Sequence, residues 1–343
     1  MAKINIIFCN NWNVGDIFFA KPFIENVVKM NGDRFEYYIW IKYSFFLFSD
    51  IQNLKNVNDF PDLIEKLGDM SAYNKRNFIL SDQDNILLIN TWIGTMNYKG
   101  HDDERTRELF GDYLKECDVV SYLNGYRRII DRIQIDHGIQ INYDYDPILA
   151  FPSFPTNVPI DKFERFKSEK MEGNQKCVFL NNYAAKSGQS ISLRTSNELL
   201  FVVDYILSKG YIVILPEEDD LVISYIHTYN INDVYFCSNF LDNAIYDYNS
   251  SSELYYRAKI CVKCDFSIYF DTGRNFLYLN RDFLDDFKQG RTKNIKIHFS
   301  TSTFDFYFKN LSSDKTVVPA DYATQYIAEG ANEVIQHLSN LHP

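Results

Sequence analysis

The sequence lacks an excess of basic residues. Its 343 residues include 35 Lys and Arg against 46 Asp and Glu, which gives a formal net charge of −11. Nucleic acids and anionic lipid headgroups are bound chiefly by Lys and Arg, so this balance argues against both as partners. A local basic pocket for one phosphorylated small molecule stays compatible with the composition.

Long hydrophobic runs are also missing. The apolar run at the start of the sequence is broken by Asn5 and ended by Asn10, which is too short for the core of a signal peptide. No stretch approaches the roughly 20 apolar residues that cross a bilayer. We therefore expect no integral membrane segment and a cytoplasmic protein.

Neither a disulfide framework nor a metal-binding motif stands out. The six cysteines are dispersed along the chain, mostly inside apolar runs, which is typical of buried thiols in a reducing compartment. Cys261 and Cys264 have the spacing of metal ligands, but no second pair accompanies them, and we place them in a strand, on opposite faces. Asp82-Gln-Asp84 precedes an expected strand, whereas a metal-binding Asp-x-Asp ends one. We expect no metal ion and no cofactor.

The pattern that recurs is an apolar strand, a polar or glycine-containing turn, and an amphipathic helix. We expect strands at residues 4–8, 35–41, 86–89, 177–180, 211–215, 234–236 and 260–262. We expect helices at residues 18–30, from 59–61 onward, and at 106–117, 119–135, 196–209, 251–258 and 321–338. This alternation is typical of parallel sheets covered by helices on both faces, so the predicted fold class is α/β.

A proline-rich stretch divides the chain. Pro147, Pro152, Pro155 and Pro159 are four of the nine prolines, and proline resists both helix interiors and central strands. We predict an N-terminal Rossmann-like domain at residues 1–150 and a C-terminal one at 151–320. A closing helix at 321–343 can pack back on the first domain. Ligands are expected beyond the carboxyl ends of the strands and in a cleft between the two lobes.

The stretch that follows the first strand, Asn11 to Pro22, carries the most specific pattern. Gly15 lets the turn approach a ligand closely, and Asp16 stands where a helix begins. A carboxylate in that place can accept a proton from a substrate hydroxyl. The same carboxylate commonly serves only to cap the helix, and spacing alone favours that interpretation.

A first strand followed by Gly-Asp, an apolar stretch and Pro22 resembles the amino-terminal signature of the heptosyltransferase-like glycosyltransferases, which have the two-Rossmann GT-B fold. The resemblance implies that Asp16 is the general base of an inverting, metal-independent sugar transfer. Polysaccharide pyruvyl transferases carry a similar Asn-x-Gly-Asp start, here Asn13–Asp16. The middle of the first domain resembles no family that we can name.

The resemblance also implies where the nucleotide-sugar donor binds. In the family, the loop after the first strand of the second domain binds the donor phosphates, and here it holds Lys186 and Arg194. The segment Asp271-Thr272-Gly273-Arg274 is similar to the family's Asp-Ser/Thr-Gly element near the diphosphate, although the histidine that usually follows is absent. If the preceding strand ends at Cys264, Asp265 and Ser267 take that position instead.

Further loops are candidates for the nucleoside and for the acceptor. Ser238 follows a strand of the second domain, where related folds contact the base. Glu217–Asp220 can bind ribose hydroxyls, although such an acidic run is more often a solvated helix start. Trp92 can stack on an acceptor sugar or pack in the core. Asn13, Gly15 and His101 complete the acceptor side, with His101 a second choice as base.

The sequence therefore predicts a glycosyltransferase that moves a sugar from a nucleotide-sugar donor to a carbohydrate or other hydroxyl acceptor, with Asp16 as base. Three alternatives stay open: a polysaccharide pyruvyl transferase, a nucleotide-sugar epimerase, and a sugar-binding protein without catalytic activity. The sequence identifies neither the sugar nor the base, acceptor or oligomeric state.

Overall fold

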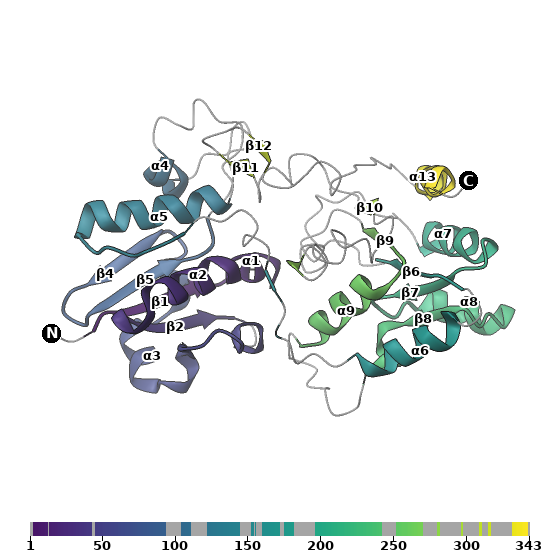
Figure 1. Ribbon diagram of the computed structural model, residues 1–343, viewed down its shortest axis with the longest axis horizontal. Coiled ribbons are helices and arrows are strands. Elements are labelled where there is room, and N and C mark those ends of the chain that lie inside the picture. Colours follow the sequence, from purple (N-terminus) through teal and green to yellow (C-terminus); the bar gives the residue numbers. More distant parts are fainter. Residues whose placement is uncertain are drawn as a thin grey trace. The chain divides into compact units, whose positions relative to one another are not determined.

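The computed structural model divides the chain into two compact units, Met1–Thr156 with Ser302–Val318, and Asn157–Thr301 with Pro319–Pro343. The structure describes residues 3–12, 14–42, 45–93, 104–110, 122–144, 152–153, 155, 160–171, 175–181, 196–241, 252–269, 280–281, 296–297, 309–310, 315–316 and 331–341. Both units combine a five-stranded sheet with helices, so the α/β class is confirmed (Figure 1).

The first unit is built on a sheet with the strand order β3-β2-β1-β5-β4. Its strands are β1 (Asn5–Asn10), β2 (Glu36–Ile41), β3 (Leu54–Asn56), β4 (Phe78–Ser81) and β5 (Ile86–Asn90). Strands β3, β2, β1 and β5 run parallel, and β4 pairs antiparallel with β5 at one edge. The sequence pattern did not predict β3 or β4, and an antiparallel edge strand on a parallel sheet is common.

Helices cover both faces of the first sheet. They are α1 (Val14–Phe19), α2 (Lys21–Asn31), α3 (Pro61–Leu67), α4 (Glu104–Phe110) and α5 (Tyr122–His137). Side chains alternate between the faces: Phe8 meets Phe23 of α2, and that ring stacks on Tyr126 of α5. On the other face, Ile7 and Leu88 pack with residues of α3. A short hairpin of β11 (Lys309–Asn310) and β12 (Lys315–Thr316) contacts α5.

The helix expected at residues 18–30 is in fact two helices, α1 and α2, which meet at Ala20. Pro22 lies in the first turn of α2, where its missing amide donor costs no hydrogen bond. Proline therefore marks the start of the second helix. Gly32 ends α2 at a φ of 50°, which glycine adopts without strain, and its amide donates to the carbonyl of Val28.

The second unit holds an all-parallel sheet with the strand order β10-β9-β6-β7-β8. Its strands are β6 (Cys177–Leu180), β7 (Ile212–Leu215), β8 (Val234–Phe236), β9 (Phe266–Tyr269) and β10 (Lys296–Ile297). Its helices are α6 (Asp161–Met171), α7 (Ser196–Ser208), α8 (Asp220–Tyr229), α9 (Ser252–Lys263) and α13 (Ala331–Leu341). Helices α7, α8 and α13 pack on one face of this sheet, where they share a core with β6 and β7.

The strand expected at residues 260–262 is wrong. Ile260, Cys261 and Val262 are buried residues of α9, which continues to Lys263, and the strand follows as β9. A short apolar run with a β-branched residue at each end does not distinguish a buried strand from a buried helix segment. The expected helix 321–338 is described only over α13, and residues 321–330 lie outside the described part of the chain.

No helix among the described residues is both long enough and apolar enough to cross a membrane.

Candidate active site

The carboxyl ends of β1 and β5, the two central strands of the first sheet, finish in the same local structure. Asn10 ends β1 and its side-chain oxygen accepts a hydrogen bond from the amide of Trp12 at 3.1 Å. Asn90 ends β5 and accepts in the same way from the amide of Trp92 at 3.0 Å. Both asparagines are buried. The two turns therefore project two indoles from neighbouring strand ends.

Those two indoles stack on each other. The ring centroids of Trp12 and Trp92 lie 4.1 Å apart with an interplanar angle of 25°. The guanidinium of Arg105, from α4, lies over the ring of Trp92, 5.2 Å from its centroid. Trp12 is 38% exposed, whereas Trp92 is half-buried. Trp92 is therefore neither a fully exposed ring nor a fully buried one, and its burial alone does not decide between the two roles expected for it.

Arg105 is a buried cation with several acceptors. Its side chain donates to the side-chain oxygen of Asn77 at 3.2 Å, to the carbonyl of Asn74 at 3.1 Å, and to the carbonyl of Trp92. A buried guanidinium is stable only where its donors are satisfied in this way. The result is a fixed support beneath Trp92.

A hydrogen-bonded network joins this edge to α5. The Tyr126 hydroxyl donates to the carbonyl of Thr91 at 3.0 Å. The Thr91 hydroxyl accepts a hydrogen bond from the Asn10 side-chain amide and donates one to the carbonyl of Cys9. Helix α5 approaches closely because Gly125 has no side chain, and a Cβ there would lie 2.5 Å from Ile93. The backbone after β5 is therefore fixed by contacts with both α5 and β1.

Asp16 lies in the first turn of α1, after the carboxyl end of β1, and it is partly exposed. Gly15, beside it, is buried. Burial raises the pKa of Tyr126 well above its usual value, with further contributions from Tyr143 and from the negative charge of Asp16. The carboxylate is thus close enough to Tyr126 to act on it electrostatically, beside the strand ends that carry the indoles.

The second unit gathers polar side chains at the carboxyl ends of β7 and β8. Glu217 follows β7 and forms an ion pair of 2.9 Å with Arg257 of α9. Glu218 accepts a hydrogen bond of 2.7 Å from the hydroxyl of Ser238, which lies in the short 3₁₀ helix Cys237–Phe240 after β8. Glu218 is exposed. An exposed carboxylate beside a hydroxyl can accept hydrogen bonds from the hydroxyl groups of a sugar.

The interpretation of the acidic run Glu217–Asp220 as a helix start is confirmed for half of it. The side chain of Asp219 caps α8 by accepting from the amides of Leu221 and Val222, and Asp220 lies in the first helical turn. Glu217 and Glu218 instead precede the helix.

Asp265 and Ser267 cannot form the loop after a strand, because β9 runs from Phe266 to Tyr269. Asp265 precedes the strand, where it forms an ion pair of 3.1 Å with Lys167 and accepts from the amide of Cys177. Ser267 is buried within the strand and donates to the carbonyl of Cys261. Both side chains are held in place by the scaffold at a distance from the carboxyl edge. Asp271 and Thr272 are the pair that follows this strand in the sequence.

Several predicted site residues lie outside the described part of the chain. They are Asn13, His101, Lys186, Arg194, Asp271, Thr272, Gly273 and Arg274.

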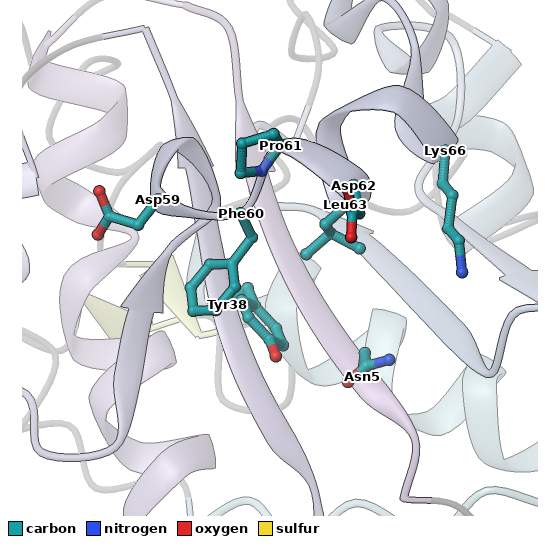
Figure 2. A pocket seen from close by; sticks show the side chains of 8 residues that line it. All are labelled: Asn5, Tyr38, Asp59, Phe60, Pro61, Asp62, Leu63 and Lys66. Atoms are coloured by element: carbon teal, nitrogen blue, oxygen red, sulfur yellow. The ribbon is translucent and has the colours of Figure 1, made fainter.

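A pocket of about 300 Å³ lies on the first unit, at the opposite end of its sheet. It is lined by Asn5, Tyr38, Asp59, Phe60, Pro61, Asp62, Leu63 and Lys66. Figure 2 shows the rings of Phe60 and Tyr38 close to each other, and their centroids are 5.3 Å apart. Asn5 opens β1, so the pocket is near the amino end of that strand. Ligands of parallel sheets bind beyond the opposite, carboxyl ends.

Five cysteines are described, and all are buried free thiols: Cys9, Cys177, Cys237, Cys261 and Cys264. The expectation of buried thiols is confirmed for them, although Cys261 lies in α9 and Cys264 just after it. Burial raises the pKa of Cys9 to about 12 and that of Cys177 to about 11. Within the described ranges, no three His, Cys, Asp or Glu side chains group together in a way that could hold a metal ion.

Trp12, Arg105 and Arg257 were missed by the sequence analysis. One signal was available for Trp12: the pattern Asn-x-Trp occurs at residues 10–12 and again at 90–92, each time at the end of a buried strand. No comparable local signal marks Arg105 or Arg257, because their partners are distant in the sequence.

No protein family profile matches this chain, and no curated protein matches it. Solved structures do resemble it. A glycosyl transferase of family 9 from Veillonella parvula is 11% identical, with a TM-score of 0.49, and the match covers 99% of this chain and 90% of that one. The Escherichia coli heptosyltransferase WaaC, solved with ADP-2-deoxy-2-fluoro heptose, is 11% identical, with a TM-score of 0.44 and coverage of 98% and 99%.

A third similar structure is a putative UDP-N-acetylglucosamine 2-epimerase from Listeria monocytogenes. It is 10% identical, with a TM-score of 0.45, and the match covers 99% of this chain and 88% of that one. The structures similar to this chain include glycosyltransferases of the kind that the first strand, the Gly15-Asp16 pair and Pro22 resemble.

Proposed function

We propose that this protein is an inverting, metal-independent glycosyltransferase that transfers a sugar from a nucleotide-sugar to a hydroxyl group of a carbohydrate acceptor. The observation that carries the proposal is the place of Asp16. It is a partly exposed carboxylate in the first helical turn after the central strand of the first sheet, near enough to Tyr126 to act on it electrostatically.

In the proposed reaction, Asp16 accepts the proton of the acceptor hydroxyl while that oxygen forms a bond to the anomeric carbon of the donor sugar. The bond between this carbon and the diphosphate oxygen breaks at the same time, and the nucleoside diphosphate leaves with the electron pair. Attack from the face opposite to the leaving group inverts the anomeric centre. A positioned base of this kind typically contributes about 10²–10⁴-fold to the rate.

The donor is assigned to the second unit. Glu218 and Ser238 are the groups proposed to bind the nucleoside, with Glu218 accepting hydrogen bonds from ribose hydroxyls. The departing diphosphate is assigned to the segments that follow β6 and β9 in the sequence, which contain Lys186, Arg194 and Asp271–Arg274. Cations and free amides stabilise the negative charge that develops on a leaving diphosphate.

A thermal-shift screen of UDP-, GDP-, ADP-, CMP- and dTDP-sugars tests this function. A donor at about 100 times its dissociation constant stabilises the native state by about 2.7 kcal/mol, so one nucleotide class is expected to raise the melting temperature. The substitution Glu218→Gln is expected to weaken that shift. Asp220→Asn, which removes a nearby exposed acid, is the matched control and leaves the shift unchanged.

The alternatives give different products. A pyruvyl transferase consumes phosphoenolpyruvate, and an epimerase converts a nucleotide-sugar without any acceptor. Consumption of phosphoenolpyruvate with no shift by any nucleotide-sugar would contradict the proposal.

A further inference from the structure

Two groups of the protein lie over the Trp92 ring. The ring of Trp12 stacks on it at a centroid distance of 4.1 Å, and the guanidinium of Arg105 lies over it at 5.2 Å. An acceptor sugar that stacked on Trp92 would compete with these two groups for the ring. Displacing Arg105 would leave a buried cation without its acceptors, which is costly.

Trp12 has more open surface than Trp92. It is 38% exposed, and the aromatic ring that stacks on it is that of Trp92. Trp12 is therefore the more exposed ring of the stacked pair, and Arg105 lies over the ring of its partner.

The stack is also held in place before any ligand binds. The Asn10 and Asn90 side chains fix the backbone at both indoles, and Arg105 is bonded to three acceptors from outside its own helix. A side chain that is already ordered loses little conformational entropy on binding, so its stacking energy contributes to affinity almost in full.

We propose that Trp12, and not Trp92, is the platform on which a pyranose ring of the acceptor stacks. This inference rests on the proposed function and adds to it the acceptor class, a neutral pyranoside. The apolar C–H face of a pyranose matches an amphipathic indole, while hydroxyls at its rim stay available for hydrogen bonds. The site lies four residues before Asp16, the proposed acceptor of the reactive hydroxyl's proton.

Saturation-transfer difference NMR on the full chain tests the inference without any nucleotide. The probes are four methyl pyranosides: β-glucoside, β-galactoside, α-mannoside and N-acetyl-β-glucosaminide. At least one is expected to receive saturation from the wild-type protein, mainly at the C–H protons of one ring face. Trp12→Ala is expected to lower that signal at least about fivefold, and Trp12→Phe to keep about half of it or more, because a phenyl ring retains a smaller apolar face.

Phe60→Ala provides a matched control. Phe60 is 37% exposed, almost the same as Trp12, and lies in the same unit but in the pocket at the amino end of the sheet (Figure 2). This variant is expected to bind the pyranoside as the wild type does. Folding of each variant is checked by its melting temperature. Iodide, which reaches only exposed indoles, is expected to quench emission several-fold less in Trp12→Phe than in the wild type.

The inference is overturned if no pyranoside binds the wild type, if the signal survives Trp12→Ala, or if Phe60→Ala abolishes it. Its failure is distinct from a failure of the proposed function. Turnover of a nucleotide-sugar without Trp12-dependent pyranoside binding refutes only the platform. Trp12-dependent binding with no turnover of any nucleotide-sugar refutes only the transfer reaction.

Discussion

Lys21 opens α2, five residues after Asp16, and its side chain is completely buried. Its ammonium lies 2.7 Å from a carboxylate oxygen of Asp50 and donates to the carbonyl of Ser153 at 2.8 Å. Asp50 is 28% exposed. The buried lysine therefore joins α2 to two distant segments of the chain, and Asp50 contributes to the compensation of its charge.

This geometry predicts that removing Asp50 lowers the free energy of unfolding more than removing the charge of Lys21 does. Asp50→Ala removes a carboxylate that lies 2.7 Å from the buried ammonium. Removing one partner of a fully buried pair costs about 3–5 kcal/mol, and we expect about 2–3 kcal/mol here, because water reaches the partly exposed Asp50 side of the pair. Lys21→Met keeps most of the apolar volume and removes the charge, so we expect a loss below about 1.5 kcal/mol. In the double variant, the cost of Asp50→Ala should largely disappear.

Urea unfolding followed by tryptophan emission measures these effects selectively. All three tryptophans, Trp12, Trp40 and Trp92, belong to the first unit. With a urea dependence of about 2 kcal/mol per M, Asp50→Ala is expected to lower the midpoint by about 1 M or slightly more. The reasoning is refuted if Lys21→Met destabilises as much as Asp50→Ala, or if the double variant is less stable than both.

Three further predictions concern other parts of the molecule. Asp219→Ala removes the cap of α8 and should destabilise the second unit by about 1 kcal/mol in thermal unfolding followed by circular dichroism, while Asp220→Ala should change it by less than about 0.5 kcal/mol. A hydrogen bond from Lys55 and the charges of Lys55 and Lys3 hold the pKa of Glu36 below its usual 4.5. The ionised Glu36 side chain therefore stabilises the fold slightly above pH 4.5, and this contribution is lost as the pH falls through the lowered pKa. NMR titration should show that Lys55→Met raises the pKa of Glu36. Because burial raises the pKa values of Cys9 and Cys177, N-ethylmaleimide followed by peptide mapping should label both slowly in the native protein and rapidly in urea, and rapid native labelling would contradict their burial.

The strands and helices were predictable wherever local patterns decide. The strands β6 and β8 have the predicted limits. The prediction failed at residues 260–262, where an apolar run suits a helix or a strand and only tertiary packing chooses between them. The edge strand β4 escaped prediction because its residues are all partly exposed, without a buried face.

The candidate site was predictable only in part, because part of it depends on contacts between elements that are distant in the sequence. Asp16 and Ser238 were found because they follow strands in the sequence. The order of the stack from Arg105 to Trp12 depends on contacts between β1, β5 and α4, which no local pattern encodes. Sequence reasoning therefore selected Trp92, which is half-buried, and passed over Trp12, which is the more exposed indole.

The role of Asp16 as a base is tested most directly by comparing turnover and donor affinity in one substitution. Asp16→Asn keeps the size of the side chain and removes its ability to accept a proton. The account predicts that turnover with the nucleotide-sugar found in the thermal-shift screen falls about 10²–10⁴-fold while the donor dissociation constant stays within about twofold. Asp62→Asn, which alters the first turn of α3, is the control and keeps full turnover. Activity of Asp16→Asn above about a tenth of wild type would contradict the account.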